Sequence, residues 1–170
     1  KMVIQASATC VMNFDDAVGY IVGEPNKGPA AMFTMMNYER LGVGIQGLAS
    51  AERSYPNAVD YARGRLQSRP PTGPQATDKP ADPIILHPDV RRMLLTMKAL
   101  IEGGRASSTY VAMQLDSARY SVCPSLRKRR AEPVALFTPA AKALLTHLGP
   151  ACRSQVRRVG KQCTSQAPPD

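Results

Sequence analysis

Apolar residues recur at helical spacing over three long stretches of this chain of 170 residues. The clearest stripe begins after Pro88, where apolar or small residues repeat every three or four positions, as on one face of a helix. Its members are Val90, Met93, Leu94, Met97, Leu100, Ile101, Gly104, Ser108, Val111, Leu115 and Ala118. A long helix with one apolar face packs against others in a bundle. The pattern therefore predicts a bundle helix that begins at Pro88.

A helix is also predicted upstream, from about Ala30 to about Leu66, with Pro29 suited to its first turn. Each glycine weakens a helix by up to about 1 kcal/mol, so the many small residues inside it indicate close approach of a neighbouring helix or a ligand. They are Gly42, Gly44, Gly47, Ala49 and Ala51. Pro56 is expected to kink or interrupt the helix, because it removes a backbone donor and crowds the preceding turn.

A third helix is predicted from about Leu126 to about Val159, although Pro133 and Pro139 leave two shorter helices open as an alternative. Its apolar face consists of Val134, Phe137, Ala141, Leu144, Leu145 and Leu148. Residues 69–83 are rich in Pro, Gly, Thr and Asp, which is typical of a loop.

The first 22 residues alternate in polarity and are rich in β-branched types, which predicts one strand and, at Tyr20-Ile21-Val22, a second. Val3, Ile4, Ala8, Thr9, Val11 and Phe14 belong to the first. Two strands do not make a stable sheet, so their partners are expected upstream, in a longer protein of which this chain is a fragment.

The net charge of +9 is concentrated in the last third of the chain. Lys and Arg number 12 against 11 Asp and Glu in residues 1–118, but 10 against 2 in residues 119–170. A nucleic-acid or membrane-surface patch is one interpretation. A solvated helix face followed by a poorly structured tail is favoured instead, because no aromatic residues interleave with the charges. No apolar run approaches the roughly 20 residues that span a bilayer, and no signal peptide is visible.

The four cysteines, Cys10, Cys123, Cys152 and Cys163, form no CxxC pair and have no histidine nearby at ligand spacing. No metal site is therefore expected, and the spacings do not indicate a disulfide framework. A reducing compartment fits this usage.

Glu39 and Arg40 stand in a segment that is otherwise almost wholly apolar or small. A carboxylate in such a setting loses hydration, which disfavours its charged form. The pair is interpreted either as a structural ion pair on a buried helix or as an acid/base group tuned by burial.

Several motifs occur in a characteristic order along residues 1–105. They are Asn13-Phe14-Asp15, Val22-Gly23-Glu24-Pro25-Asn26-Lys27-Gly28, Glu39-Arg40-Leu41, His87-Pro88-Asp89-Val90-Arg91-Arg92-Met93-Leu94 and Glu102-Gly103-Gly104-Arg105. In this order they resemble the acyl-CoA dehydrogenases, and within them a bacterial branch of fatty acyl-CoA and 3-methylmercaptopropionyl-CoA dehydrogenases. The resemblance covers roughly residues 1–149 and is looser after Arg105.

The resemblance implies a mainly α fold: an incomplete four-helix bundle of three long helices, preceded by one or two strands from a truncated β-domain. Residues 1–27 would be the end of the middle β-domain, residues 28–160 the C-terminal bundle, and residues 161–170 a disordered tail. It also implies a flavin enzyme of fatty-acid β-oxidation, with FAD as cofactor, that converts acyl-CoA thioesters to trans-2-enoyl-CoA. An electron-transferring flavoprotein, a homo-dimer or tetramer and a cytoplasmic location belong to the same expectation.

The site residues implied by the resemblance lie on the first long helix. Met36, Asn37 and Arg40 match positions that line the acyl-CoA site, and Arg65 matches an arginine that reaches the flavin pyrophosphate of a neighbouring subunit. Glu39 matches the base of a minority of the family. A pocket-lining carboxylate paired with Arg40 is the alternative, because most members use a Glu in a Tyr-Glu-Gly-Thr loop that this chain lacks.

The chain also departs from the family pattern after the third helix, where residues 153–163 replace the expected Gly-Gly-His-Gly-Tyr segment. A shifted reading frame or a truncated gene is one hypothesis for this ending. An inactive remnant, or a helical interaction module with a basic C-terminal face, is therefore kept as the alternative function.

Overall fold

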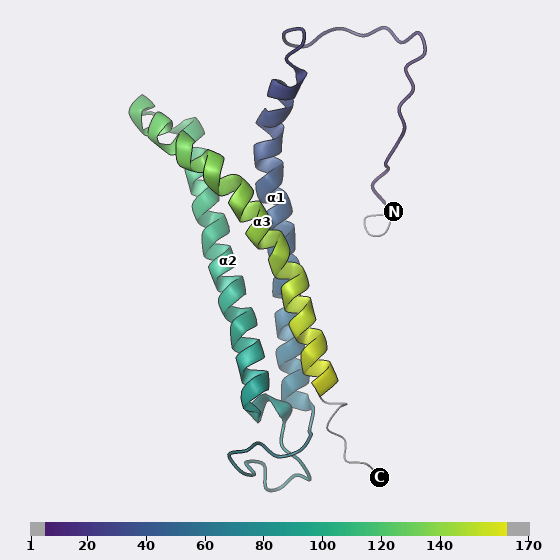
Figure 1. Ribbon diagram of the computed structural model, residues 1–170, viewed down its shortest axis with the longest axis vertical. Helices are drawn as coiled ribbons and strands as arrows, with labels where there is room; N and C mark the ends of the chain where they lie inside the picture. The colour runs from purple at the N-terminus through teal and green to yellow at the C-terminus, as the bar shows by residue number, and fades with distance from the viewer. Residues whose placement is uncertain (1–5, 163–170) are drawn as a thin grey trace. The chain divides into compact units, whose positions relative to one another are not determined.

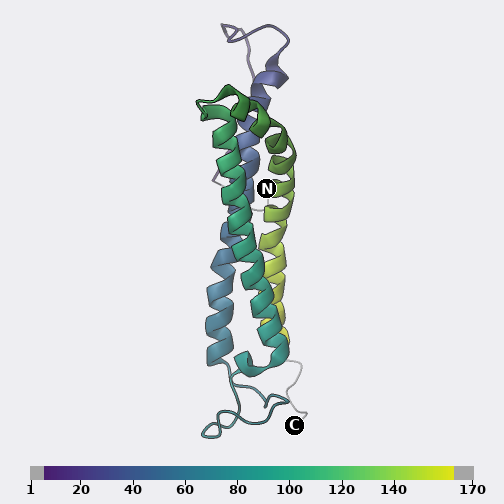
Figure 2. The same cartoon turned by 90° about the vertical axis from the view of Figure 1, so that its left-hand side faces the viewer.

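The computed structural model describes residues 6–162, with side chains described through residue 160. The chain divides into two units, residues 1–34 and 35–170. Its helices are α1 (Gly28–Gly64), η1 (a 3-10 turn, Ile84–Leu86), α2 (Pro88–Tyr120) and α3 (Pro124–Gln162). Within the second unit the three long helices lie side by side, with α2 antiparallel to α1 and α3 (Figure 1, Figure 2). The predicted mainly helical fold with three long helices is confirmed.

The strands expected before α1 are absent from residues 6–27, which form turns, bends and extended backbone. The prediction is wrong for this segment, because a strand needs a partner for its backbone N–H and C=O groups and none is present among the described residues. Val3 and Ile4 lie outside those residues. Of the predicted tail, residues 161 and 162 still belong to α3, and the rest lies outside the described part.

The internal prolines do not divide the helices. α1 continues through Pro56, and α3 continues through Pro133, Pro139 and Pro150. The two shorter helices considered for the third stretch are therefore replaced by one. α3 nevertheless bends in its first half (Figure 1), as expected where prolines interrupt the backbone hydrogen-bond ladder.

The core lies along the line where the three helices meet. Almost the whole predicted stripe of α2 is buried, although Leu100 is 37% exposed. On α3, the predicted core residue Leu144 is 50% exposed. Gly104 marks the centre of the junction. A Cβ placed on it would lie 2.6 Å from Leu148 Cδ1 of α3 and 3.2 Å from Leu48 Cδ1 of α1. Leucines from both other helices therefore use the space that a side chain at this position would fill.

α1 and α3 approach most closely at Gly47. A Cβ on this residue would clash with the carbonyl oxygen of Leu145 and would lie 2.8 Å from Thr146 Cα. The neighbour is backbone, which cannot rotate away as a side chain can. A neighbouring helix therefore explains Gly44 and Gly47, whereas Gly42 and Ala49 are exposed and have no such explanation.

The loop between α1 and η1 is organised by the buried carboxylate of Asp82. It accepts hydrogen bonds from the backbone amides of Gln75 and Ala76, at 3.2 and 2.5 Å, and pairs with Arg69 at 3.2 Å. Gln67 N donates to the Asp82 carbonyl, and Asp82 N to that of Ser68, both at 3.0 Å. Burial raises the pKa of Asp82, but the amides of Ala76 and Gln75 and the Arg69 guanidinium outweigh it and hold that pKa below its ordinary value.

Replacing Gly47 with Ala should lower the free energy of unfolding by about 1–3 kcal/mol, because the new methyl group must push α3 away. Gly42 is the matched control, since it lies on the same helix and a Cβ there meets nothing within 4 Å. Gly42→Ala should be stabilising by about 0.5–1 kcal/mol. Urea unfolding followed by circular dichroism measures both. Equal effects of the two substitutions would contradict the close approach.

Asp82→Asn should destabilise the protein at neutral pH, because an amide cannot accept the same set of hydrogen bonds as a carboxylate. The folded-state pKa lies below the ordinary value of 3.8, so the carboxylate stabilises the fold above that value. Its contribution is lost as the pH falls through the folded-state pKa. The difference in free energy of unfolding between the parent and the variant should therefore decrease as the pH is lowered from 7 to 3. Urea unfolding at each pH measures it. A difference that stays constant would contradict this role.

Candidate functional site

The residues that the sequence singled out on the first helix lie in the early turns of α1. Met36, Asn37 and Arg40 are half-buried, and Arg40 donates from Nη1 to Asn37 Oδ1 at 3.3 Å. Leu41, Gly44 and Leu48 follow on the buried face of the same helix. Asn37 precedes Leu41 by four residues, about one turn, so it lies at the end of this buried stripe.

Glu39 lies on the other side of α1 and is exposed. It precedes buried Leu41 by two residues, which correspond to about 200° of rotation around a helix. The expectation that this carboxylate loses its hydration is therefore wrong within this chain. The apolar neighbours of Glu39 in the sequence point elsewhere, because helical geometry separates adjacent residues.

Tyr38 connects these turns of α1 to the end of α2. Its hydroxyl oxygen accepts a hydrogen bond from Arg119 Nη1 at 2.8 Å, and the guanidinium carbon lies 5.4 Å from the centre of the Tyr38 ring. The same carbon lies 5.4 Å from the ring centre of Tyr120. The hydrogen bond to Tyr38 and the nearby phenols raise the pKa of Arg119. The sequence did not indicate this contact, since 81 residues separate the partners.

Arg65 lies at the opposite end of α1, one residue beyond its last residue, Gly64. It is exposed, and its carbonyl accepts a hydrogen bond from Ile84 N at 2.9 Å. Arg65 follows Glu39 by 26 positions, so at a rise of 1.5 Å per position the two are about 39 Å apart along the helix axis. One copy of the chain therefore cannot bring both to the same small molecule.

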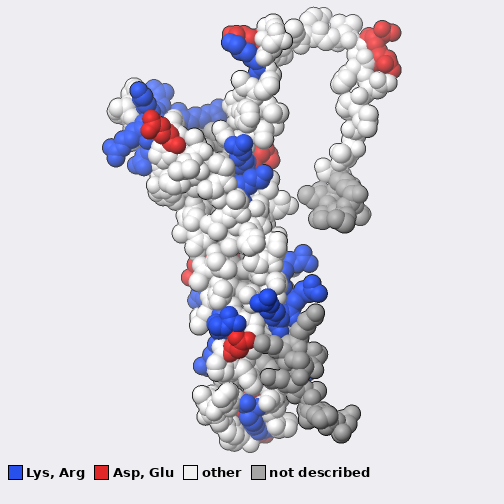
Figure 3. All heavy atoms as spheres, viewed as in Figure 1, with Lys and Arg blue, Asp and Glu red and all other residues white. Residues whose placement is uncertain are grey.

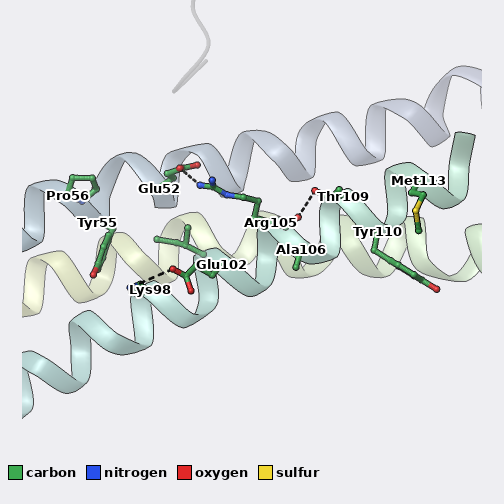
Figure 4. Close-up of a pocket in the computed structure, with 11 residues that line it drawn as sticks. Glu52, Tyr55, Pro56, Lys98, Glu102, Arg105, Ala106, Thr109, Tyr110 and Met113 are labelled. Atoms are coloured by element: carbon green, nitrogen blue, oxygen red, sulfur yellow. Dashed lines mark hydrogen bonds and ion pairs between the residues drawn. The ribbon is translucent and has the colours of Figure 1, made fainter.

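A groove of about 720 Å³ runs between α1 and α2, away from these residues (Figure 4). Glu52 of α1 faces Arg105 of α2 across it and forms an ion pair with it, and Lys98 pairs with Glu102 at 3.8 Å. Beyond these pairs the walls are largely apolar, with Tyr55, Tyr110 and Met113 among the lining side chains. The charged groups satisfy one another, and none is placed as a nucleophile beside a base.

Among residues 6–162, no group of three or more His, Cys, Asp and Glu side chains is placed to hold a metal ion. Cys10, Cys123 and Cys152 are free thiols, and Cys163 lies outside the described residues. Over the same residues, no helix has both the length and the apolarity that crossing a bilayer would require.

The family described as "Acyl-CoA dehydrogenase, C-terminal domain" matches residues 26–147. The 3-methylmercaptopropionyl-CoA dehydrogenase of Ruegeria pomeroyi is 49% identical over 147 residues, which make up 86% of this chain and 24% of the relative.

Two further relatives are also named as dehydrogenases of acyl-CoA thioesters. A broad-specificity linear acyl-CoA dehydrogenase of Mycobacterium tuberculosis is 41% identical over 69% of this chain and 20% of its own length. A butyryl-CoA dehydrogenase of Syntrophomonas wolfei is 32% identical over 87% of this chain and 25% of its own length. The chain thus spans about a quarter of the length of the curated relatives it matches.

Tyr38→Phe should loosen the early turns of α1, because it removes the hydrogen bond from Arg119 but keeps the ring. The loss of one exposed hydrogen bond corresponds to a roughly two- to fivefold faster local opening. Amide hydrogen exchange of residues 38–42 measures it. Tyr61→Phe, on an exposed part of the same helix, is the control and should leave these amides unchanged. Equal exchange in Tyr38→Phe and the parent would show that the contact does not hold α1.

Proposed function

Because this chain belongs to the acyl-CoA dehydrogenase family, we propose that it is part of a flavin-dependent enzyme that desaturates acyl-CoA thioesters at the α,β position. The match of residues 26–147 to the C-terminal domain of that family carries the proposal. The three-helix bundle is the part that this domain contributes. The remaining three quarters of such an enzyme would supply most of the flavin and substrate contacts.

The early turns of α1 would form one wall of the acyl-CoA site. Met36 offers an apolar side chain for the acyl chain, and Asn37 and Arg40 offer N–H donors for the polar groups of the thioester. The Arg40–Asn37 hydrogen bond supports this arrangement, because it orients both polar ends before any ligand binds. The Tyr38–Arg119 contact would hold the wall against α2.

Among the described residues, Arg65 is the one that we assign to FAD. The exposed guanidinium of Arg65 has the planar fork that pairs well with phosphate oxygens, and it takes part in none of the five ion pairs among the described residues. When bound, FAD would accept the β-hydrogen as hydride. Since Arg65 lies about 39 Å from Glu39 along α1, Arg65 would contact the flavin of a neighbouring subunit rather than that of its own site.

Glu39 has two candidate roles at this site. As a base, its carboxylate would remove the α-proton of the thioester, which requires that the rest of the enzyme covers it and raises its pKa. As a pocket-lining group, it would contribute charge while a glutamate beyond this chain takes the proton. We favour the second role, because the usual family base follows the fourth bundle helix and Glu39 is exposed here.

The partners follow from the same family assignment. Acyl-CoA would be the substrate and an electron-transferring flavoprotein the acceptor of the electrons. A homo-dimer or tetramer in the cytoplasm belongs to the same proposal. The chain by itself is expected to retain little or no flavin, because it would supply only the Arg65 contact.

A chimaera tests the proposal. Residues 28–147 of this chain should replace the corresponding segment of the Ruegeria pomeroyi relative, with which the chain is 49% identical. Purified chimaera should retain FAD at a stoichiometry near one and should oxidise an acyl-CoA in an acceptor-coupled assay. A folded chimaera without flavin or turnover would instead support the inactive remnant.

Glu39→Gln in this chimaera distinguishes the two roles of the carboxylate. If Glu39 only lines the pocket, kcat should fall less than about tenfold, whereas removal of a general base costs about 10²–10⁴-fold. Glu52→Gln is the matched control, since it changes an exposed glutamate of the same helix that lies in the α1–α2 groove. A loss of 100-fold or more in Glu39→Gln, with Glu52→Gln unaffected, would make Glu39 the base.

A further inference from the structure

A second groove, of about 780 Å³, lies between α1 and α3. It runs beside the closest approach of the two helices, where Gly47 of α1 meets the backbone of α3. The lining residues of α1 are small or polar, and those of α3 come from its second half. They are Val43, Gln46, Gly47, Ser50, Thr146, Gly149, Pro150, Arg153, Ser154, Arg157 and Arg158.

Among the residues that the structure describes, three arginines and no acidic residue line this groove. Arg153, Arg157 and Arg158 are exposed, and none belongs to the five ion pairs among the described residues. Arg153 and Arg157 are one turn apart on α3, where like charges repel each other. In Figure 3, Lys and Arg side chains gather along the second half of α3 with few acidic side chains among them. The described lining of the groove therefore carries positive charge and no negative charge.

Stabilisation of the end of α3 does not account for these arginines. Cations favour the carboxyl end of a helix, but the effect falls off within the last turn. α3 ends at Gln162, so Arg153 lies nine residues, or more than two turns, before the end. Arg157 and Arg158 also precede the last turn. Their common feature is the groove that they line.

We propose that this groove binds a small anion with two or more linked phosphate groups. The guanidinium fork suits phosphate oxygens, and the amide of Gln46 adds a neutral donor on the opposite wall. Arg153 and Arg158 are about 7.5 Å apart along the axis of α3, a span that favours a chain of phosphates over a single one. The proposal is independent of the dehydrogenase function, because all three arginines follow residue 147, where the family match ends.

Titration calorimetry of the full chain with tripolyphosphate, ATP and orthophosphate tests the proposal. Tripolyphosphate and ATP should bind one per chain, at least tenfold more tightly than orthophosphate, and more weakly as salt is added. Equal affinity of the first two assigns the site to the phosphate chain, and tighter binding of ATP assigns it to a nucleotide. Binding that does not saturate, or orthophosphate that binds as well as tripolyphosphate, overturns the proposal.

Paired variants separate a site from a general effect of charge. Arg157→Gln combined with Arg158→Gln should weaken tripolyphosphate binding at least tenfold. Arg127→Gln combined with Arg129→Gln removes the same charge from exposed positions elsewhere on α3 and should change it less than twofold. Equal losses in the two double variants overturn the proposal. If the first double variant does not fold, Arg157→Lys keeps the charge but not the fork, and unchanged binding in that variant overturns the proposal as well.

Discussion

The rest of the bundle depends on the close approach of α1 and α3. At Gly47, backbone atoms of α3 occupy the volume that a side chain would need, and Gly104 of α2 gives similar room to leucines of both other helices. Protein interiors are packed about as densely as organic crystals, so helices in such contact have little freedom to slide or rotate. The contacts at Gly44 and Gly47 therefore set which side of this part of α1 faces α3.

The positions of the two surfaces that the proposed function uses follow from this orientation. With Leu41, Gly44 and Leu48 turned toward the other helices, Glu39 is left on the opposite side of α1. That surface is available to the other three quarters of a protein of the relatives' length. Arg65 lies at the far end of the same rigid helix. A helix of this length separates the proposed substrate wall from the proposed flavin contact, so under the proposed function the two would serve different sites.

Helical periodicity predicted the bundle because burial follows it closely, as it does from Val90 to Leu115 in α2. Helical and strand periodicity gave wrong predictions where the burial of a residue depends on which other segments pack against it. Leu144 belongs to the apolar stripe of α3 but lies half-exposed, and within residues 6–27 the β-branched residues form no strand. Glu39 shows the same limit at the site, because apolar neighbours in sequence do not desolvate a side chain that points the other way. The contact of Arg119 joins residues 81 positions apart, so no local pattern could have indicated it. The contacts of Asp82 lie within one loop, which has no periodic pattern to indicate them.

The arginines near the end of the chain show that composition alone does not indicate where charged side chains converge. As a sequence, the excess of arginine after residue 119 favoured a solvated helix face, which needs no ligand. The small residues that let α1 approach α3 leave little side-chain volume beside the contact, so a hollow remains between the helices. Arg153, Arg157 and Arg158 have the spacing that places all three along that hollow. The same charges on an isolated helix would be dispersed in solvent, whereas here one anion can contact them together. The glycines of α1 thus determine both how the bundle closes and where its positive charge converges.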